Sequence, residues 1–203
     1  MTENKKENLN NRMIKFLFEG APVRGACVQM AEEWQEMIKF HHYPENVAAL
    51  LGQFTAGALL LSSTIKFEGS LILQVKGSGP IAFIYAEVRN PMSVRAMTEI
   101  REGAEIKPEM DLQELINKDG KGLCALILDP KDRRPGVQPY QGMVSLESNS
   151  VAENLENYMA KSEQLETKLY LAADCKKLGG LVIQKMPSVG GNVSEISEPD
   201  AWG

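Results

Sequence analysis

The stretch from Val47 to Ile65 constrains the fold more than any other part of this sequence. Its nineteen residues, VAALLGQFTAGALLLSSTI, include no charged side chain and come close to the length needed to cross a bilayer. Polar and glycine positions dilute the stretch, and Pro44 precedes it at a position favoured in the first turn of a helix. The pattern therefore predicts a central helix over residues 44–64 that is buried on most sides, with a membrane span as the alternative.

Two further helices are predicted from apolar residues at helical spacing. One covers residues 25–41 and carries Cys27 on its apolar face, and the other covers residues 150–161. At the start of the second, Ser150 and Glu153 fit the reciprocal capping box, in which each side chain accepts a hydrogen bond from the other's backbone amide. Both helices are amphipathic, so we expect them to pack against a sheet.

Short apolar runs separated by glycine, proline and polar turns indicate β-strands. These runs cover residues 65–67, 71–75, 81–88, 94–100, 123–128, 143–146, 169–172 and 181–186, with a short helix over residues 110–117. Gly179 and Gly180 lie between the last two runs, which predicts a hairpin. The elements together predict an α+β fold, mostly antiparallel sheet with the three longer helices packed against it.

Two of these strands are apolar on both faces in places, around Ile72 and between Phe83 and Tyr85. Such strands either lie between two layers or leave an apolar face available to another molecule. The sequence therefore offers Ile72, Phe83 and Tyr85 as a candidate apolar binding surface.

Composition narrows the classes of function. The net charge of −5 argues against a nucleic-acid partner, which would require a basic face. Residues 1–12 are polar, which predicts a disordered leader and gives no sign of a signal peptide. Three widely spaced cysteines indicate reduced thiols in a cytoplasmic protein rather than a disulfide framework.

The three cysteines differ in their sequence surroundings. Cys27 and Cys124 lie in apolar segments, so we expect both to be buried and inert. Cys175 precedes Lys176 and Lys177, which could lower its pKa modestly, but we favour the interpretation as a solvated loop thiol. No redox switch within this chain is predicted.

No set of residues in the sequence indicates catalysis or metal binding. Ser63 and Lys66 match the S-x-x-K acylation motif of penicillin-recognising serine enzymes, but the S-D-N-like and K-[ST]-G elements of that chemistry are missing. His41 and His42 are adjacent, so on a helix their side chains diverge and cannot easily share a metal ion. We therefore predict no enzyme, with a serine acyl-transfer enzyme using Ser63 and Lys66 as the alternative.

Several motifs occur in a consistent order along the chain. They are FLFEG-x-x-VRG at residues 16–25, IKFEG at 65–69, QVKGSGP at 74–80, YQG-x-V-x-LE at 140–147, S-x-A-x-x-LE-x-Y at 150–158 and SEQL-x-T-x-L-x-LAA at 162–173. In this combination the sequence resembles the bacterial redox-regulated 33-kDa heat-shock chaperone family. The match runs from about residue 16 to residue 187, so it is more specific than any single motif.

The resemblance implies an ATP-independent holdase, which binds unfolded proteins and prevents their aggregation under oxidative and heat stress. It implies a homodimer with Ser162, Glu163 and Gln164 at the subunit contact, and client proteins as partners, with neither nucleic acid nor membrane. Family members carry a linker and a C-terminal zinc lobe with CxC and CxxC motifs, which act as a redox switch, and this sequence has none of those cysteines. We therefore expect a chaperone core over residues 13–187, the start of the linker over residues 188–203, and no cofactor within this chain.

Overall fold

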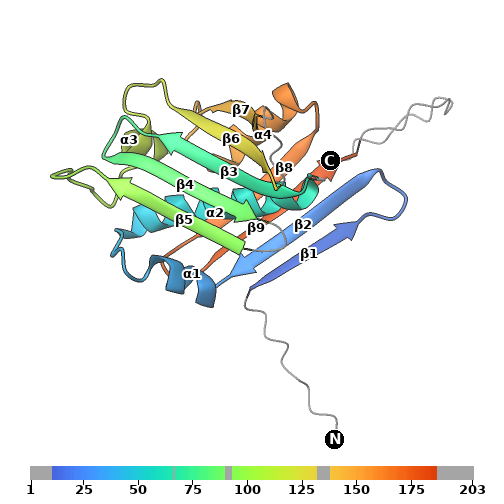
Figure 1. Ribbon diagram of the computed structural model, residues 1–203, viewed down its shortest axis with the longest axis horizontal. Coiled ribbons are helices and arrows are strands. Elements are labelled where there is room, and N and C mark those ends of the chain that lie inside the picture. The colour runs from blue at the N-terminus through green and yellow to red at the C-terminus, as the bar shows by residue number, and fades with distance from the viewer. Residues whose placement is uncertain (1–10, 66, 90–92, 132–137, 187–203) are drawn as a thin grey trace, which may run out of the picture.

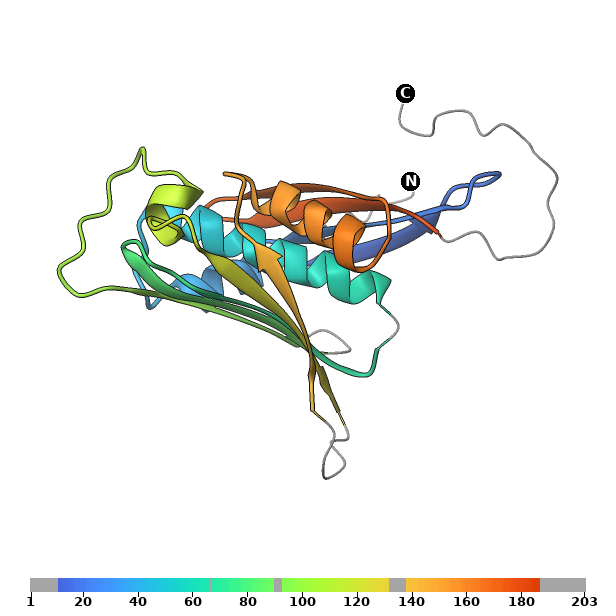
Figure 2. The ribbon, with the colours of Figure 1, turned by 90° about the horizontal axis from the view of Figure 1, so that it is seen from above.

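The helix α2 (Glu45–Thr64) lies between two β-sheets and contacts both of them (Figure 2). The computed structural model describes residues 11–65, 67–89, 93–131 and 138–186. A four-stranded sheet has the order β1-β2-β9-β8, a five-stranded sheet has the order β5-β4-β3-β6-β7, and every neighbouring pair is antiparallel. The remaining elements are β1 (Arg12–Leu17), β2 (Val23–Met30), α1 (Glu32–Ile38), β3 (Gly69–Lys76), β4 (Ile81–Arg89), β5 (Ser93–Ile100), α3 (Leu112–Ile116), β6 (Leu123–Pro130), β7 (Tyr140–Ser145), α4 (Val151–Ser162), β8 (Thr167–Ala173) and β9 (Leu178–Lys185). The predicted α+β fold is confirmed.

Helix α2 is buried on several sides at once, as its apolar composition predicts. A Cβ atom at Gly57 would lie 2.7 Å from Leu155 of α4, 3.6 Å from Leu171 of β8 and 3.9 Å from Leu73 of β3, so only glycine lets these neighbours approach. Among the described residues α2 alone is long and apolar enough to cross a membrane, yet 78% of its apolar window is buried inside the protein. The helix predicted over residues 44–64 is confirmed as a core helix, with Pro44 as the N-cap.

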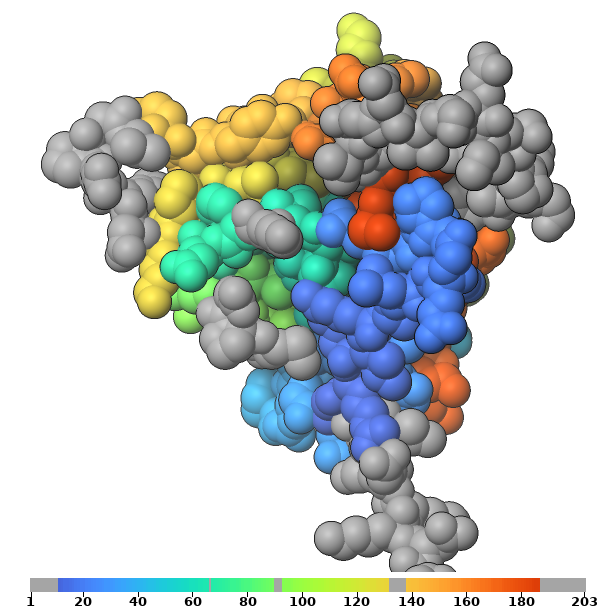
Figure 3. All heavy atoms as spheres, turned by 90° about the vertical axis from the view of Figure 1, so that its right-hand side faces the viewer, coloured from blue at the N-terminus to red at the C-terminus, as the bar shows by residue number. Residues whose placement is uncertain are grey.

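The helix predicted over residues 25–41 is wrong in its first part, which is strand β2. β2 pairs with β1 on one side and β9 on the other, and the helix α1 begins only at Glu32. Backbone hydrogen bonds to β1 and β9 outweigh the helical spacing of the apolar residues in this segment. Much of that spacing came from residues that belong to α1. Figure 3 shows β1 and β2 (blue) beside the end of β9 (red).

Other boundaries also differ from the predictions. The strand predicted over residues 65–67 is not formed, because Ile65 caps α2 and β3 begins at Gly69. Of the predicted leader, residues 1–10 lie outside the described residues, and Arg12 already begins β1. The predicted linker start over residues 188–203 also lies outside the described residues. The predicted hairpin is confirmed as β8–β9, but its turn lies at residues 174–177, because Gly179 and Gly180 belong to β9 and pair with Ala172 and Leu171.

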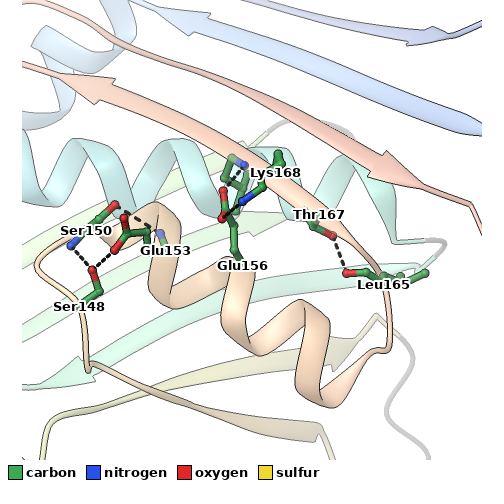
Figure 4. Close-up of polar contacts among 8 residues, drawn as sticks. Ser148, Ser150, Glu153, Glu156, Leu165, Thr167 and Lys168 are labelled. Carbon is green, nitrogen blue, oxygen red and sulfur yellow. Dashed lines mark hydrogen bonds and ion pairs between the residues drawn. The ribbon is translucent and has the colours of Figure 1, made fainter. Parts of the chain in front are cut away.

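Helix α4 is held at both ends by side-chain hydrogen bonds (Figure 4). The N-cap Ser150 accepts a hydrogen bond from the Glu153 amide at 3.3 Å, as predicted. The reciprocal half of the predicted capping box is wrong, because the Glu153 carboxylate accepts from the Ser148 hydroxyl instead. At mid-helix Glu156 accepts from Lys168 Nζ at 3.1 Å and from the Leu169 amide at 2.7 Å, which ties α4 to β8. A complete capping box occurs at α3, between Asp111 and Glu114.

Candidate functional site

The five-stranded sheet has one face against the helices and one face turned away from them (Figures 1 and 2). Along β3, Leu71, Leu73 and Val75 point inward and are at most 2% exposed. Because successive side chains of a strand point to opposite faces, Ile72 and its neighbours on adjacent strands point outward. In Figure 1 this outward side faces the viewer, and no described helix crosses it.

The outward side chains form rows across the strands. In one, mostly apolar row the register brings Met97, Tyr85, Gln74, Ala125 and Met143 side by side. A second row pairs Ile72 with Ile127 on one side and with Glu87 on the other. Phe83 belongs to a third row, between Lys76 and Glu99, and stacks on Tyr85 with the ring centroids 6.2 Å apart. We call the apolar members the outer sheet face: Ile72, Phe83, Tyr85, Met97, Ala125, Ile127 and Met143.

The outer sheet face is accessible to solvent. Met97 is 45% exposed and Met143 is 48% exposed, whereas Ile72, Phe83 and Tyr85 are half-buried by their neighbours on the sheet. The sequence located Ile72, Phe83 and Tyr85, and the structure brings all three onto one face. The sequence analysis missed the other four members of the outer sheet face, because only the strand register reveals that they share this face.

Charged side chains lie next to the apolar residues of the outer sheet face. Glu87 is only 8% exposed, and its carboxylate accepts hydrogen bonds from the Tyr85 hydroxyl at 3.1 Å and from Arg89 at 3.4 Å, while Arg95 is its cross-strand partner. Burial, reinforced by the adjacent Glu87 carboxylate, raises the pKa of the Tyr85 hydroxyl. The tyrosine therefore stays neutral at physiological pH, and the face presents apolar surface bordered by paired charges.

The serine of the S-x-x-K motif is not arranged for catalysis in the described part of the chain. Ser63 lies in the last turn of α2, and its hydroxyl donates to the Leu60 carbonyl at 2.7 Å. Lys66, its proposed partner, lies outside the described residues. His41 stacks on Tyr43, with ring centroids 5.0 Å apart. Within the described ranges no three His, Cys, Asp or Glu side chains come together as a metal site.

The structure gives each cysteine a different environment. Cys124 is buried, as predicted, and burial raises the pKa of its thiol to about 12. Cys27 lies on the outward side of strand β2 and is partly exposed, so the prediction of a buried helical position is wrong. The pKa of the exposed Cys175 is raised by burial and by the carboxylates of Glu45 and Asp174, so the suggested lowering by neighbouring lysines is also wrong.

We expect thiol labelling of the native protein to separate these three residues. At neutral pH Cys175 and Cys27 should react with a maleimide, whereas Cys124 should react at least ~100-fold more slowly because it must wait for local unfolding. Peptide mass spectrometry over a time course measures this. Equal rates at Cys124 and Cys175 would contradict the buried position of Cys124.

Ser162, Glu163 and Gln164 lie where α4 ends and the chain turns toward β8. All three are exposed, and Gln164 has a positive φ of 54°. The Glu163 carboxylate accepts from the Tyr158 hydroxyl at 3.0 Å and the Tyr140 hydroxyl at 3.3 Å, which joins the end of α4 to β7. Burial and the hydrogen bonds with Tyr140 and Glu163 raise the pKa of Tyr158, so its hydroxyl remains a donor.

Comparisons with known proteins give a consistent result. A family model described as Hsp33 protein matches residues 11–200. The 33 kDa chaperonin of Methylobacillus flagellatus is 35% identical over 195 residues, covering 96% of this chain and 62% of that protein. The 33 kDa chaperonin of Neisseria gonorrhoeae strain NCCP11945 is 38% identical over 195 residues, covering 96% and 61%. The chain thus spans about three fifths of the length of these relatives.

A solved structure supports the fold. The crystal structure of the 33 kDa chaperonin (heat shock protein 33 homolog) from Thermotoga maritima superposes with a TM-score of 0.68 at 22% identity, covering 87% of this chain and 62% of that one. This chain therefore belongs to the Hsp33 family.

Proposed function

We propose that this chain is the client-binding core of a molecular chaperone. It binds non-native polypeptides without ATP and prevents their aggregation under heat and oxidative stress. The name shared by its relatives, 33 kDa chaperonin, supports this class of activity. The observation that carries the proposal is the outer sheet face, an apolar surface that no described helix covers.

The chemistry of this face suits an unfolding protein rather than a small molecule. The surface is a sheet bordered by paired charges, and it offers contact to many different apolar side chains. Burying one such side chain contributes about 1.5–3 kcal/mol, so two or three contacts suffice for reversible binding. The border of charge favours solubility of the free protein.

Regulation is part of the proposal. In the family, a linker covers the core while a C-terminal lobe holds zinc, and oxidation with loss of zinc releases the linker. We propose that the zinc is held in that lobe and not in this core. Reduced thiols and the acidic composition agree with a cytoplasmic protein that does not bind nucleic acid.

A scattering assay tests the proposed activity. A client enzyme is unfolded by heat in dithiothreitol, with and without an equal concentration of this chain. Because no described helix covers the outer sheet face, we expect the 203-residue chain to lower the scattering without peroxide or zinc chelator. Scattering equal to that of the client alone would reject the proposal.

We also propose a homodimer with Ser162, Glu163 and Gln164 at the contact. Replacing Glu163 with arginine should weaken association, because it removes an acceptor of two tyrosine hydroxyls and reverses a charge at the contact. Sedimentation at low micromolar concentration measures the result. Glu163→Gln is the matched control, since it keeps the size of the side chain and one carbonyl acceptor. If Glu163→Arg sediments as the wild type does, this residue is not at the interface.

A further inference from the structure

Strand β7 has a free backbone edge. The Leu146 amide donates to the Gly122 carbonyl at 3.1 Å, which fixes the hydrogen-bonding phase of the β6–β7 ladder. In an antiparallel ladder, hydrogen-bonded pairs of residues alternate with non-hydrogen-bonded pairs. The N–H and C=O groups of Gln141, Met143 and Ser145 therefore point away from β6. In the described parts of the chain no group forms a hydrogen bond with these backbone atoms.

Other sheet edges are closed or carry charge. At β5, the Tyr43 hydroxyl accepts from the Thr98 amide at 3.2 Å and donates to the Thr98 carbonyl at 3.0 Å. At β8, the Glu156 carboxylate takes the outward amide of Leu169. Strand β1 carries Lys15, and lysine on an edge strand discourages pairing. Strand β7, with the sequence YQGMVS, has no charged residue and no proline.

A cavity of about 60 Å³ lies beside this free edge, between β7 and α4. From the strand side it is lined by Met143 and Ser145, and from the helix side by Asn157, Lys161 and Ser162. An edge strand facing a helix across a groove is an arrangement by which proteins add an extended peptide to a sheet. Water or the polar side chains that line the cavity can form hydrogen bonds with the edge of such a peptide that faces away from β7.

We propose that β7 binds an extended segment of a non-native polypeptide as an additional antiparallel strand. An extended polypeptide presents alternating N–H and C=O groups at the spacing of a strand, and these match the three free residues of β7. Every second side chain of the added strand would lie on the same side of the sheet as Met143, whose side chain belongs to the outer sheet face. This inference rests on the proposed function and deepens it, because main-chain bonds make binding independent of client sequence.

The test removes one outward amide and keeps the fold. In Met143→Pro the lost N–H is one that does not bond to β6, and proline is tolerated on edge strands at such positions. Met143→Leu is the reference for Met143→Pro, since both variants replace the methionine side chain and only the leucine variant keeps the amide. Binding of a permanently unfolded, carboxymethylated and fluorescently labelled polypeptide is measured by anisotropy in dithiothreitol, and circular dichroism verifies folding.

We expect Met143→Pro to bind roughly tenfold more weakly than Met143→Leu, through lost bonds and a steric block. Ser145→Pro removes a second outward amide and should act in the same way. If both proline variants fold and bind as the wild type does, strand addition is wrong. If only substitutions on the outer sheet face weaken binding of the polypeptide, the proposed function still stands. No binding by the wild type would reject both. A change from dimer to monomer in Met143→Pro, without a change in polypeptide binding, would assign the edge to a second copy and overturn the inference.

Discussion

Replacing Trp34 with alanine is expected to lower the free energy of unfolding by about 3–5 kcal/mol. The indole is 0% exposed, packs beneath Gly52 of α2, and donates from Nε1 to the Asp174 carbonyl at 2.7 Å. It therefore joins α1, α2 and the β8–β9 turn through one side chain. Alanine would leave a cavity and an unpaired carbonyl, and both are costly.

The matched control is Trp34→Phe, which keeps most of the apolar volume and removes the hydrogen bond. It should cost about 1–2 kcal/mol. Urea unfolding followed by circular dichroism measures both variants. If Trp34→Ala loses no more than Trp34→Phe, the indole is not the packing centre that its burial indicates.

The core helix could be predicted from the sequence because its nineteen uncharged residues leave few other solutions. Local signals also placed α4, since Ser150 caps it and apolar residues follow at helical spacing. The β8–β9 hairpin was predicted as a pair of strands, but its turn was wrongly placed at Gly179 and Gly180, which lie within β9. In each case the information lies within one short segment.

Elements that depend on distant partners were not predictable in this way. β2 has residues compatible with a helix, and it becomes a strand because β1 and β9 pair with it. The outer sheet face was found only in part, because Met97 and Met143 join Tyr85 through register across four strand pairs. The free edge of β7 left no sequence signal, since it follows from the hydrogen-bonding phase of the ladder.

A negative charge on the outer sheet face should abolish most binding of non-native polypeptide. In Phe83→Asp a carboxylate replaces the ring that stacks on Tyr85, at a half-buried position between Lys76 and Glu99 on the adjacent strands. A client covering that position would lose the apolar contact of the ring and would have to bury a charged group, which costs at least about 1.5–3 kcal/mol. Affinity should therefore fall at least roughly tenfold.

The matched control is Phe40→Asp, which makes the same chemical change at a site that is 78% exposed, follows α1 and is not part of the outer sheet face. Met97→Asp provides a second test on the face, at a position that is already 45% exposed and tolerates a polar group more easily. All three variants should keep the far-ultraviolet circular dichroism spectrum of the wild type.

The most direct measurement of the central claim is the dissociation constant of Phe83→Asp and Phe40→Asp for one permanently unfolded polypeptide, in dithiothreitol. If the outer sheet face is the client site, Phe83→Asp and Met97→Asp should bind the polypeptide at least roughly tenfold more weakly than the wild type, and Phe40→Asp should bind it equally well. Equal affinity of Phe83→Asp, Phe40→Asp and the wild type would contradict the account and place the client surface elsewhere on the protein.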